Sequence, residues 1–558
     1  MPEHRKTRHS HGAGTPRQDL GEALWRLSDL VRADERRRSF RAKAYRRAVW
    51  SLDDLAPDLS DPPERALSFP GIGTGVMRLI EEFRENGALE SLERLEQLYP
   101  AESARIRRLP RMTPAILRAL KGELGIDTTA DLVAAIETGG VEALRGVGPA
   151  SAEQWAERLQ LAPSLASVPS FQAHVLADAL SRHLHRHLGG TVEVAGAVRR
   201  GEEWVETVEL VSGIDDVGAG REFLEGTAVA RLVGDRPSGE TVLQTYEDAV
   251  ASVHLVPPSQ LGRRLLEVTG PDRHARPLLA DIDADGLSES EIYERNGRLW
   301  VPPPARALDP EVAEGVIRNG QIKGDLHLHT DLSPDGRMTL FEIAAEATDR
   351  EYEYILITDH TSGLRFGGLD SAGLDRQREM IEEARAGFPD LLVLQGAELN
   401  IDRDGSLDID DESLSRLDFA VAGVHSHFDL DRLEQTARVL KALSHPVVRV
   451  LAHPTGRRIG NRPAIDLDID AVVAAAIENH VALEVNGHRD RLDLSAGLAA
   501  MAVAAGAVLT ANSDSHRIGE MGNVANSVAT MQRAGIAPSS VVNTMSVEAF
   551  REWAGVIG

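Results

Sequence analysis

From residue 321 to the C-terminus, short apolar runs alternate with alanine-rich helical segments, and this alternation narrows the possible folds more than any other feature. The runs are YEYILIT, LLVLQGAEL, FAVAGV, VVRVLAH, VALEVNG and AVLTANS. Such alternation is typical of parallel βα units. Six or seven units in succession predict a closed βα barrel over residues 321–558.

Histidine and carboxylate side chains recur at the ends of these predicted strands. Ten of the 19 histidines lie in this segment. His327 and His329 are two residues apart, so on a strand they point to the same side. Further candidates follow the later strands: Asp335, His360, Glu398, His425, His453, Asp514 and His516. The carboxyl ends of barrel strands form the active-site face, so we expect these side chains to converge there.

The chain has no cysteine, so a metal would have to be bound by histidine and carboxylate side chains. Imidazole and carboxylate together suit Zn, Mn or Fe, and several such groups can hold more than one ion. A single histidine is more often structural than a ligand, and His445, His480 and His488, which lie off the pattern, are predicted to be structural. The recurrence at strand after strand favours a metal site.

Arginines in the predicted strand-end loops are candidates for binding phosphate through bidentate hydrogen bonds, although each is an equal candidate for a plain surface residue. They are Arg365, Arg457, Arg458, Arg489 and Arg491. Clustered divalent ions and arginines together predict metal-dependent phosphoester hydrolysis.

These motifs resemble the PHP (polymerase and histidinol phosphatase) domain, a distorted (β/α)7 barrel. The resemblance implies three divalent ions, Mn²⁺ or Zn²⁺ with Fe²⁺ as a further option. It implies that His327, His329, Glu398 and Asp514 hold the first ion. Glu398 would bridge to a second ion, held with His425 and His453. The third would be held by Asp335, His360 and His516, which makes all nine residues the catalytic set.

The front half is predicted to be helical at first, with apolar residues three and four apart from Leu20 to Leu109. Residues 1–50 hold 13 basic and 6 acidic residues, including Arg37, Arg41 and Arg46, which could contact phosphates or merely form a solvated face. Glycine turns precede two helices, at Gly71 and Gly73 and at Gly146 and Gly148. Such turns expose backbone N–H groups and favour helix-hairpin-helix units that grip a DNA backbone. The PRMT turn between them is degenerate.

The whole chain resembles the bacterial family X DNA polymerases through FRAKAYRRA, the turn at 70–73, GAVRRG at 196–201 and EIYERNGRLWVPPPAR at 291–306. The implied fold is multidomain, α+β and α/β. Its expected parts are a disordered tail (1–15), a helical DNA-binding domain (16–95), a helix-hairpin-helix domain (96–165), a degenerate nucleotidyltransferase palm and thumb (166–305), a linker (306–320) and the PHP domain (321–558).

The expected polymerase carboxylates are largely missing. A two-metal polymerase needs three of them to hold Mg²⁺. Counting on from GAVRRG, two of the places are taken by Thr207 and Glu209, and the third, shortly before Pro257-Pro258, is taken by Ser252. We therefore expect that polymerase activity is lost.

The net charge of −26 argues against nucleic acid only on average, because the first 50 residues are basic. No apolar run predicts a membrane span or signal peptide, so a cytoplasmic monomer without membrane contact is expected. The favoured function is a 3′–5′ exonuclease on single-stranded, gapped or abasic DNA in repair. The alternatives are a small-molecule phosphatase of the histidinol-phosphate type, a polymerase with residual activity, and a DNA-binding scaffold without catalysis.

Overall fold

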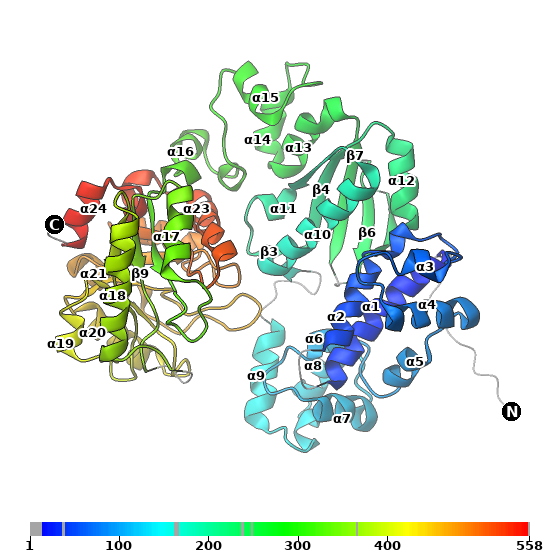
Figure 1. The fold of residues 1–558 in the computed structure, drawn as a ribbon, viewed down its shortest axis with the longest axis horizontal. Helices are drawn as coiled ribbons and strands as arrows, with labels where there is room; N and C mark the ends of the chain where they lie inside the picture. Colours follow the sequence, from blue (N-terminus) through cyan, green and yellow to red (C-terminus); the bar gives the residue numbers. More distant parts are fainter. Residues whose placement is uncertain are drawn as a thin grey trace.

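The computed structural model describes residues 14–35, 39–160, 167–235, 239–246, 249–363 and 367–555 (Figure 1). The expected tail lies outside these residues, except for residues 14 and 15. In the part of the chain so described, no helix is long and apolar enough to cross a membrane.

Helices joined by tight turns make up the chain up to residue 160. They are α1 (Pro16–Asp34), α2 (Phe40–Val49), α3 (Pro63–Ala66), α4 (Thr74–Asn86), α5 (Glu90–Glu96), α6 (Ser103–Ile106), α7 (Pro114–Leu124), α8 (Thr129–Glu137) and α9 (Pro149–Gln160). In α1 a capping box at Thr15 satisfies the first N–H groups, and Leu20, Leu24 and Leu27 bury one face. This spacing of three and four is the one that predicts the helix.

Three turns in this region share one backbone geometry, and they precede α4, α7 and α9. Gly71, Arg111 and Gly146 occupy equivalent places with φ of 87°, 58° and 91°. In each turn the next residue donates its N–H to the carbonyl three residues back. Gly71 also packs closely, since a Cβ there would lie 2.8 Å from the Arg47 backbone. The turn that looks degenerate in sequence therefore keeps its shape, with Arg111 in a conformation that favours glycine.

The next region builds a five-stranded sheet in the order β2-β4-β7-β6-β5, in which β4 and β7 run parallel and the other pairs antiparallel. Its strands, with the small pair β1 and β3, are β1 (Val168–Pro169), β2 (Thr191–Ala195), β3 (Trp204–Val205), β4 (Thr207–Gly213), β5 (Ala230–Asp235), β6 (Thr241–Thr245) and β7 (Val250–Val256). Its helices are α10 (Ser170–Leu188), α11 (Gly196–Arg199), α12 (Val217–Gly226) and α13 (Leu261–Thr269). The mixed sheet lies within residues 166–305, the range that the sequence predicts to be a palm and thumb, and we call it the palm-like part.

A small helical layer beyond the sheet is fixed by a buried ion-pair network. Its helices are α14 (Asp272–Leu279), α15 (Glu289–Arg295) and α16 (Pro310–Gly315). Glu289 accepts two hydrogen bonds from Arg199, at 2.8 and 2.9 Å, and one from Arg306 at 2.8 Å. Arg306 is fully buried, and Ile317 packs into the barrel core, so the segment predicted as a linker is anchored at both ends.

Residues from 324 onward form a barrel surrounded by helices. The strands are β8 (Gly324–Leu328), β9 (Tyr354–Ile357), β10 (Leu392–Gln395), β11 (Glu398–Asn400), β12 (Ala420–Gly423), β13 (Val448–Leu451), β14 (Ala482–Asn486) and β15 (Leu509–Asn512). The helices are α17 (Leu340–Asp349), α18 (Ser371–Gly387), α19 (Asp411–Leu414), α20 (Arg432–Leu443), α21 (Ile469–Glu478), α22 (Ala496–Ala504), α23 (Val524–Arg533) and α24 (Val547–Ala554).

The barrel strands are all parallel but fall into two sheets, β10-β9-β8 and β11-β12-β13-β14-β15. β10 and β11 are two parts of one interrupted strand, so the barrel has seven strand positions. A parallel bridge from Leu328 to Ser515 and another from His360 to Glu398 join the two sheets. The barrel is therefore closed but distorted at the two joins, as predicted for residues 321–558.

Loops of the barrel contact the front half beside α9 and β3 (Figure 1). Arg457 forms a bidentate pair with Glu203, at 2.9 and 2.8 Å. Arg158 of α9 donates to the Asn461 Oδ1 at 2.6 Å, and Arg533 donates to the Gly201 carbonyl at 2.8 Å. These contacts hold the mouth of the barrel against the palm-like sheet.

Replacing Glu289 with Gln is expected to destabilise the front half by about 3–5 kcal/mol, because the buried Arg306 and the partly buried Arg199 guanidinium groups lose their carboxylate. Burial opposes ionisation of Glu289, but hydrogen bonds from Arg199 and Arg306 outweigh it and lower its pKa to about 2. The carboxylate therefore contributes stability that is complete above its ordinary pKa of 4.5 and is lost as the pH falls toward 2. Urea unfolding between pH 7 and pH 3 measures both effects.

The exposed Glu311 at the start of α16 supplies the matched control, Glu311→Gln. If both variants unfold at the same urea concentration, or if the difference between Glu289→Gln and wild type does not shrink in acid, the network does not stabilise the fold as argued.

Candidate metal centre

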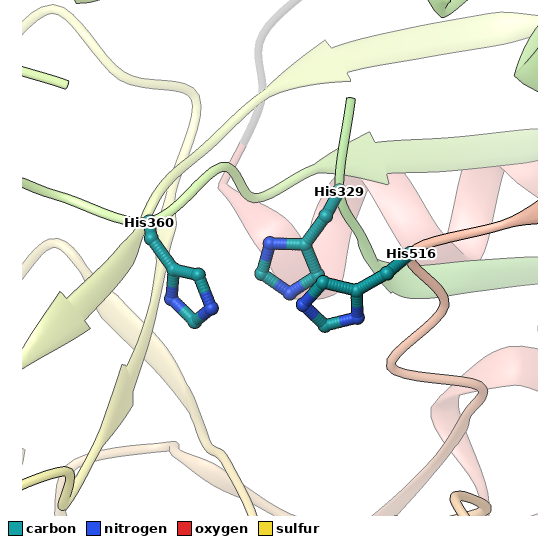
Figure 2. A group of neighbouring side chains, drawn as sticks. All are labelled: His329, His360 and His516. Carbon is teal, nitrogen blue, oxygen red and sulfur yellow. The ribbon is translucent and has the colours of Figure 1, made fainter. Parts of the chain in front are cut away.

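All nine predicted donor residues lie at one end of the barrel, because each follows or ends a parallel strand. His327 lies in β8 and His329 directly after it, both with side chains fully buried. Figure 2 shows the imidazoles of His329, His360 and His516 turned toward one another. The His329 ring centroid lies 4.4 Å from that of His360 and 4.1 Å from that of His516.

Glu398, the first residue of β11, lies at the centre of the cluster. Its Oε1 is 2.9 Å from the His425 Nε2 and 2.8 Å from the His453 Nε2. Its Oε2 is 2.8 Å from the His360 Nδ1, 3.4 Å from the His327 Nε2 and 3.5 Å from the His329 Nε2. One carboxylate therefore touches five imidazoles.

Asp514 and Asp335 extend the cluster on its other side. Asp514 Oδ1 lies 3.5 Å from the His327 Nε2 and 3.4 Å from the His329 Nε2. Asp335 Oδ2 lies 3.4 Å from the His516 Nε2 and 3.8 Å from the His360 Nε2. The nine side chains thus form one continuous network of ligand atoms.

Three groups within this network are compact enough to hold an ion, since the ligand atoms of each lie within 4.8 Å of one another. They are His327, His329 and Asp514; His360, Glu398 and His425; and His329, His360 and His516. The first agrees with the ligand set implied by the PHP resemblance. His360 belongs to both of the other groups, whereas the resemblance gives it to the third ion only.

The residues fit divalent metal ions on their own chemistry. The His327 Nε2 and the His329 Nε2 are buried, and the Glu398 Oε2 and the Asp514 Oδ1 face both of them at 3.4–3.5 Å. Burial and the neighbouring His516 and His360 hold the pKa of His329 well below its ordinary value, so its imidazole is neutral. Imidazoles and ionised carboxylates aimed at one point are the donor set of a divalent transition metal.

Close packing around the cluster restricts the backbone. A Cβ on Gly423 would lie 2.8 Å from the His453 Cε1 and 3.0 Å from the His425 Cε1, so only glycine leaves room for both rings. His453 and Asp514 have positive φ, 30° and 54°, which L-residues rarely adopt. Strained backbone at buried ligand residues is typical of a functional site.

A buried carboxylate that the sequence analysis did not select supports the cluster from below. Glu484 in β14 accepts from the His327 Nδ1 at 2.8 Å and from the His453 backbone N–H at 2.7 Å. Asn486 bridges Glu484 and Asp514, at 3.0 Å to each. Such partners fix the tautomer and orientation of ligand imidazoles. The only sequence signal was a glutamate in the middle of the apolar run VALEVNG.

The predicted phosphate-binding arginines have different positions. The Arg491 Nε lies 3.4 Å from the Asp514 Oδ2, beside the cluster, and Arg458 lies 3.6 Å from Asp490. Arg457 pairs with Glu203 of the front half, and Arg489 lies near His174 of α10. Arg365 is outside the described residues.

The predicted DNA-contacting arginines of the N-terminal helices have acidic neighbours. Arg41 pairs with Glu35, while Arg46 pairs with Asp29 at 2.5 Å and lies over the Trp25 ring. Arg37 is outside the described residues. The glycines of the first and last turns, Gly71, Gly73, Gly146 and Gly148, lie directly before α4 and α9.

The three expected polymerase positions lie together on neighbouring strands. Glu209 of β4 is the register partner of Ser252 of β7, and Thr207 lies two residues before Glu209 on the same strand. Among the three, Glu209 is the one carboxylate, and the His254 Nε2 lies 4.0 Å from it. The Arg264 guanidinium donates to the His254 Nδ1 at 2.9 Å, so His254 links an arginine to the one carboxylate at the positions where the polymerase resemblance implies metal.

Two family models and several relatives match parts of this chain. The helix-hairpin-helix domain family matches residues 15–89, which contain the first glycine turn, and the PHP domain family matches residues 325–488. A probable phosphatase of Acetivibrio thermocellus is 32% identical over 244 residues, which is 41% of this chain and 93% of that protein. The structure of a Lactococcus lactis histidinol phosphate phosphatase, complexed with zinc, L-histidinol and phosphate, aligns at 18% identity and a TM-score of 0.30, over 38% of this chain and 93% of that one.

One relative extends over nearly the whole chain. It is the DNA polymerase/3′-5′ exonuclease PolX of Bacillus subtilis, 29% identical over 546 residues, which is 92% of this chain and 95% of the relative. Helical, palm-like and barrel parts follow one another here in the order that the sequence predicts. Over nearly its whole length the chain is therefore similar to the PolX type of family X polymerases, and its C-terminal barrel, which matches the PHP domain family, carries a divalent metal site of the phosphoesterase kind.

Proposed function

We propose that the barrel is a metal-dependent 3′–5′ exonuclease that acts on DNA held by the front half. The observation that carries the proposal is the convergence of nine histidine and carboxylate donors at the mouth of the barrel, where Glu398 contacts five of the imidazoles. The relative that aligns with almost all of this chain bears the name of a polymerase and 3′-5′ exonuclease.

Three divalent ions, Mn²⁺ or Zn²⁺, would be held by these donors. His327, His329 and Asp514 would bind one, Glu398 with His425 and His453 a second, and Asp335 with His360 and His516 a third. Bound ions of this kind lower the pKa of water and neutralise charge on phosphate oxygens. An exonuclease site that accepts a 3′ end could serve in the repair of abasic or gapped DNA.

The protein's own groups orient the site and position a phosphate. Arg491 is nearly buried beside Asp514, where its guanidinium can donate to phosphate oxygens. Glu484 and Asn486 hold His327 and Asp514 in place. Asp493 accepts from the Thr455 N–H and hydroxyl, which fixes the loop after His453.

A small-molecule phosphatase is the second candidate, because several relatives that cover the barrel alone are named probable phosphatases. The front half argues against it. Arg457 and Arg533 tie the barrel to the palm-like part by side-chain contacts that a free phosphatase does not need. We expect the full chain to prefer DNA over histidinol phosphate.

Purified protein with Mn²⁺ is expected to shorten single-stranded DNA from the 3′ end. His327→Ala and Asp514→Ala should reduce this degradation below detection, because each removes a ligand from the buried cluster. Gel analysis of 5′-labelled oligonucleotides measures it. His445→Ala is the control, since His445 lies away from the cluster and close to Asp411. Degradation by both cluster variants at the wild-type rate would refute the assignment, and phosphate release from histidinol phosphate with DNA intact would favour the second candidate.

The same preparation is expected to incorporate no nucleotide into a primed template with Mg²⁺. Thr207 and Ser252 cannot bind a metal as carboxylates do, and the His254 imidazole, which accepts from the Arg264 guanidinium, lies 4.0 Å from Glu209. Primer extension with the Asp514→Ala variant measures this without interference from degradation. Extension of the primer by that variant would show that polymerase activity survives.

Glu484→Gln is expected to weaken metal binding about 10–100-fold while the fold is kept, because an amide accepts the His327 and His453 hydrogen bonds less strongly than a carboxylate. Titration of Zn²⁺ into metal-stripped protein measures the affinity. Glu478→Gln, on the exposed end of α21, is the control. Equal affinities in the two variants would mean that Glu484 does not support the ligands.

A further inference from the structure

Four arginines form a row between the metal cluster and the helical region, and we call them the arginine strip: Arg491, Arg458, Arg462 and Arg158. Arg491 lies beside Asp514 at the cluster. Arg458 and Arg462 belong to the loop after His453, and Arg158 belongs to α9. The loop extends from the barrel toward α9 (Figure 1).

The loop that carries the strip is held rigidly. Arg458 and Arg462 exchange backbone hydrogen bonds of 2.8 and 2.7 Å. The Arg462 Nε donates to the Gly456 carbonyl at 2.8 Å, and its guanidinium lies 3.7 Å from the centroid of the Phe428 ring. These contacts restrict the Arg462 side chain before any ligand binds, which lowers the entropy cost of binding.

The strip continues into the front half without a break. Arg158 donates to the Asn461 Oδ1 at 2.6 Å, which places α9 next to the loop. Gly460 packs on β1, since a Cβ there would lie 2.8 Å from the Pro169 Cγ. The row therefore joins the helix that follows the last glycine turn to the metal cluster.

Positive charge on the strip exceeds the negative charge that faces it. Arg458 pairs with Asp490 and Arg491 with Asp514, whereas among the described residues no carboxylate forms an ion pair with Arg462 or Arg158. Burial, with the nearby Arg491, Arg458 and Arg158, lowers the pKa of Arg462 to about 10. Neighbouring guanidinium groups repel one another unless an anion lies between them.

We propose that the arginine strip binds the phosphate backbone of a single DNA strand and leads its 3′ end from α9 to the metal cluster. The proposal rests on the nuclease function proposed above and names the path of its substrate. A row of cations suits the repeating phosphates of a nucleic-acid strand. A small phosphate ester would contact only one end of the row. A single strand fits better than a duplex because Asp514 and His453, the ligand residues at the end of the row, are almost fully buried.

The test uses the full chain with Arg158→Ala and Arg462→Ala combined. Binding of a fluorescein-labelled oligothymidylate in EDTA, followed by anisotropy across a salt series, gives the slope of log K against log salt. Each lost phosphate contact on a single strand lowers that slope by about 0.7, so a decrease of about 1.4 is expected. Binding at low salt should weaken at least tenfold.

Two further variants make the result decisive. Arg158→Lys with Arg462→Lys keeps both charges and should keep the wild-type slope. Arg376→Ala, on the exposed face of α18, should bind like wild type. An unchanged slope in the alanine variant, or an equal loss in the lysine variant, would overturn the proposed path. If wild-type protein binds the oligonucleotide with the expected slopes but never shortens it with Mn²⁺, the strip stands and the nuclease function fails.

Discussion

The carboxylate of Glu398 joins the two sheets of the barrel into one site. Its two oxygens contact imidazoles that follow β8, β9, β12 and β13, while the residue itself begins β11 at the bridge to His360. Burial opposes its ionisation, but His425, His360 and His327 outweigh burial and hold its pKa well below the ordinary value. A buried anion with this many imidazoles is stable only while the charges around it balance, and divalent ions supply that balance most directly.

The distortion of the barrel follows from this requirement. The strand through residues 392–400 is interrupted between β10 and β11, and Glu398 lies just after the interruption, where it pairs with Val421 and bridges to His360. Gly423 has no side chain, which leaves room for two imidazoles, and His453 and Asp514 adopt a backbone conformation with positive φ. Each of these costs stability locally, and each places a ligand atom, so the fold bears strain where the chemistry requires it.

The sequence predicts that the nine side chains meet, because strand periodicity and the succession of parallel strands can both be followed along the chain. HxH after an apolar strand must place His327 and His329 on one side, and parallel strands must end at one face. The sequence does not predict that Arg457 forms an ion pair with Glu203, because the two residues are 254 positions apart and belong to different parts of the chain. Glu484 is missed for another reason: a carboxylate in the middle of a buried run has no sequence signal until its imidazole partner is known. The turn at Arg111 shows that backbone geometry can persist where its glycine does not.

The acidity of the chain is compatible with a nucleic-acid partner because its charges are segregated. The net charge is −26, yet several of the acidic groups face inward, where Glu398, Asp514 and Glu484 contact imidazoles and would face metal. The guanidinium groups that reach the barrel mouth are held at its rim, between the metal cluster and α9. Overall repulsion by the acidic surface disfavours nonspecific binding, while the rim attracts phosphate over a distance comparable to the Debye length. Under the proposed nuclease function, a DNA strand would therefore be drawn to this rim.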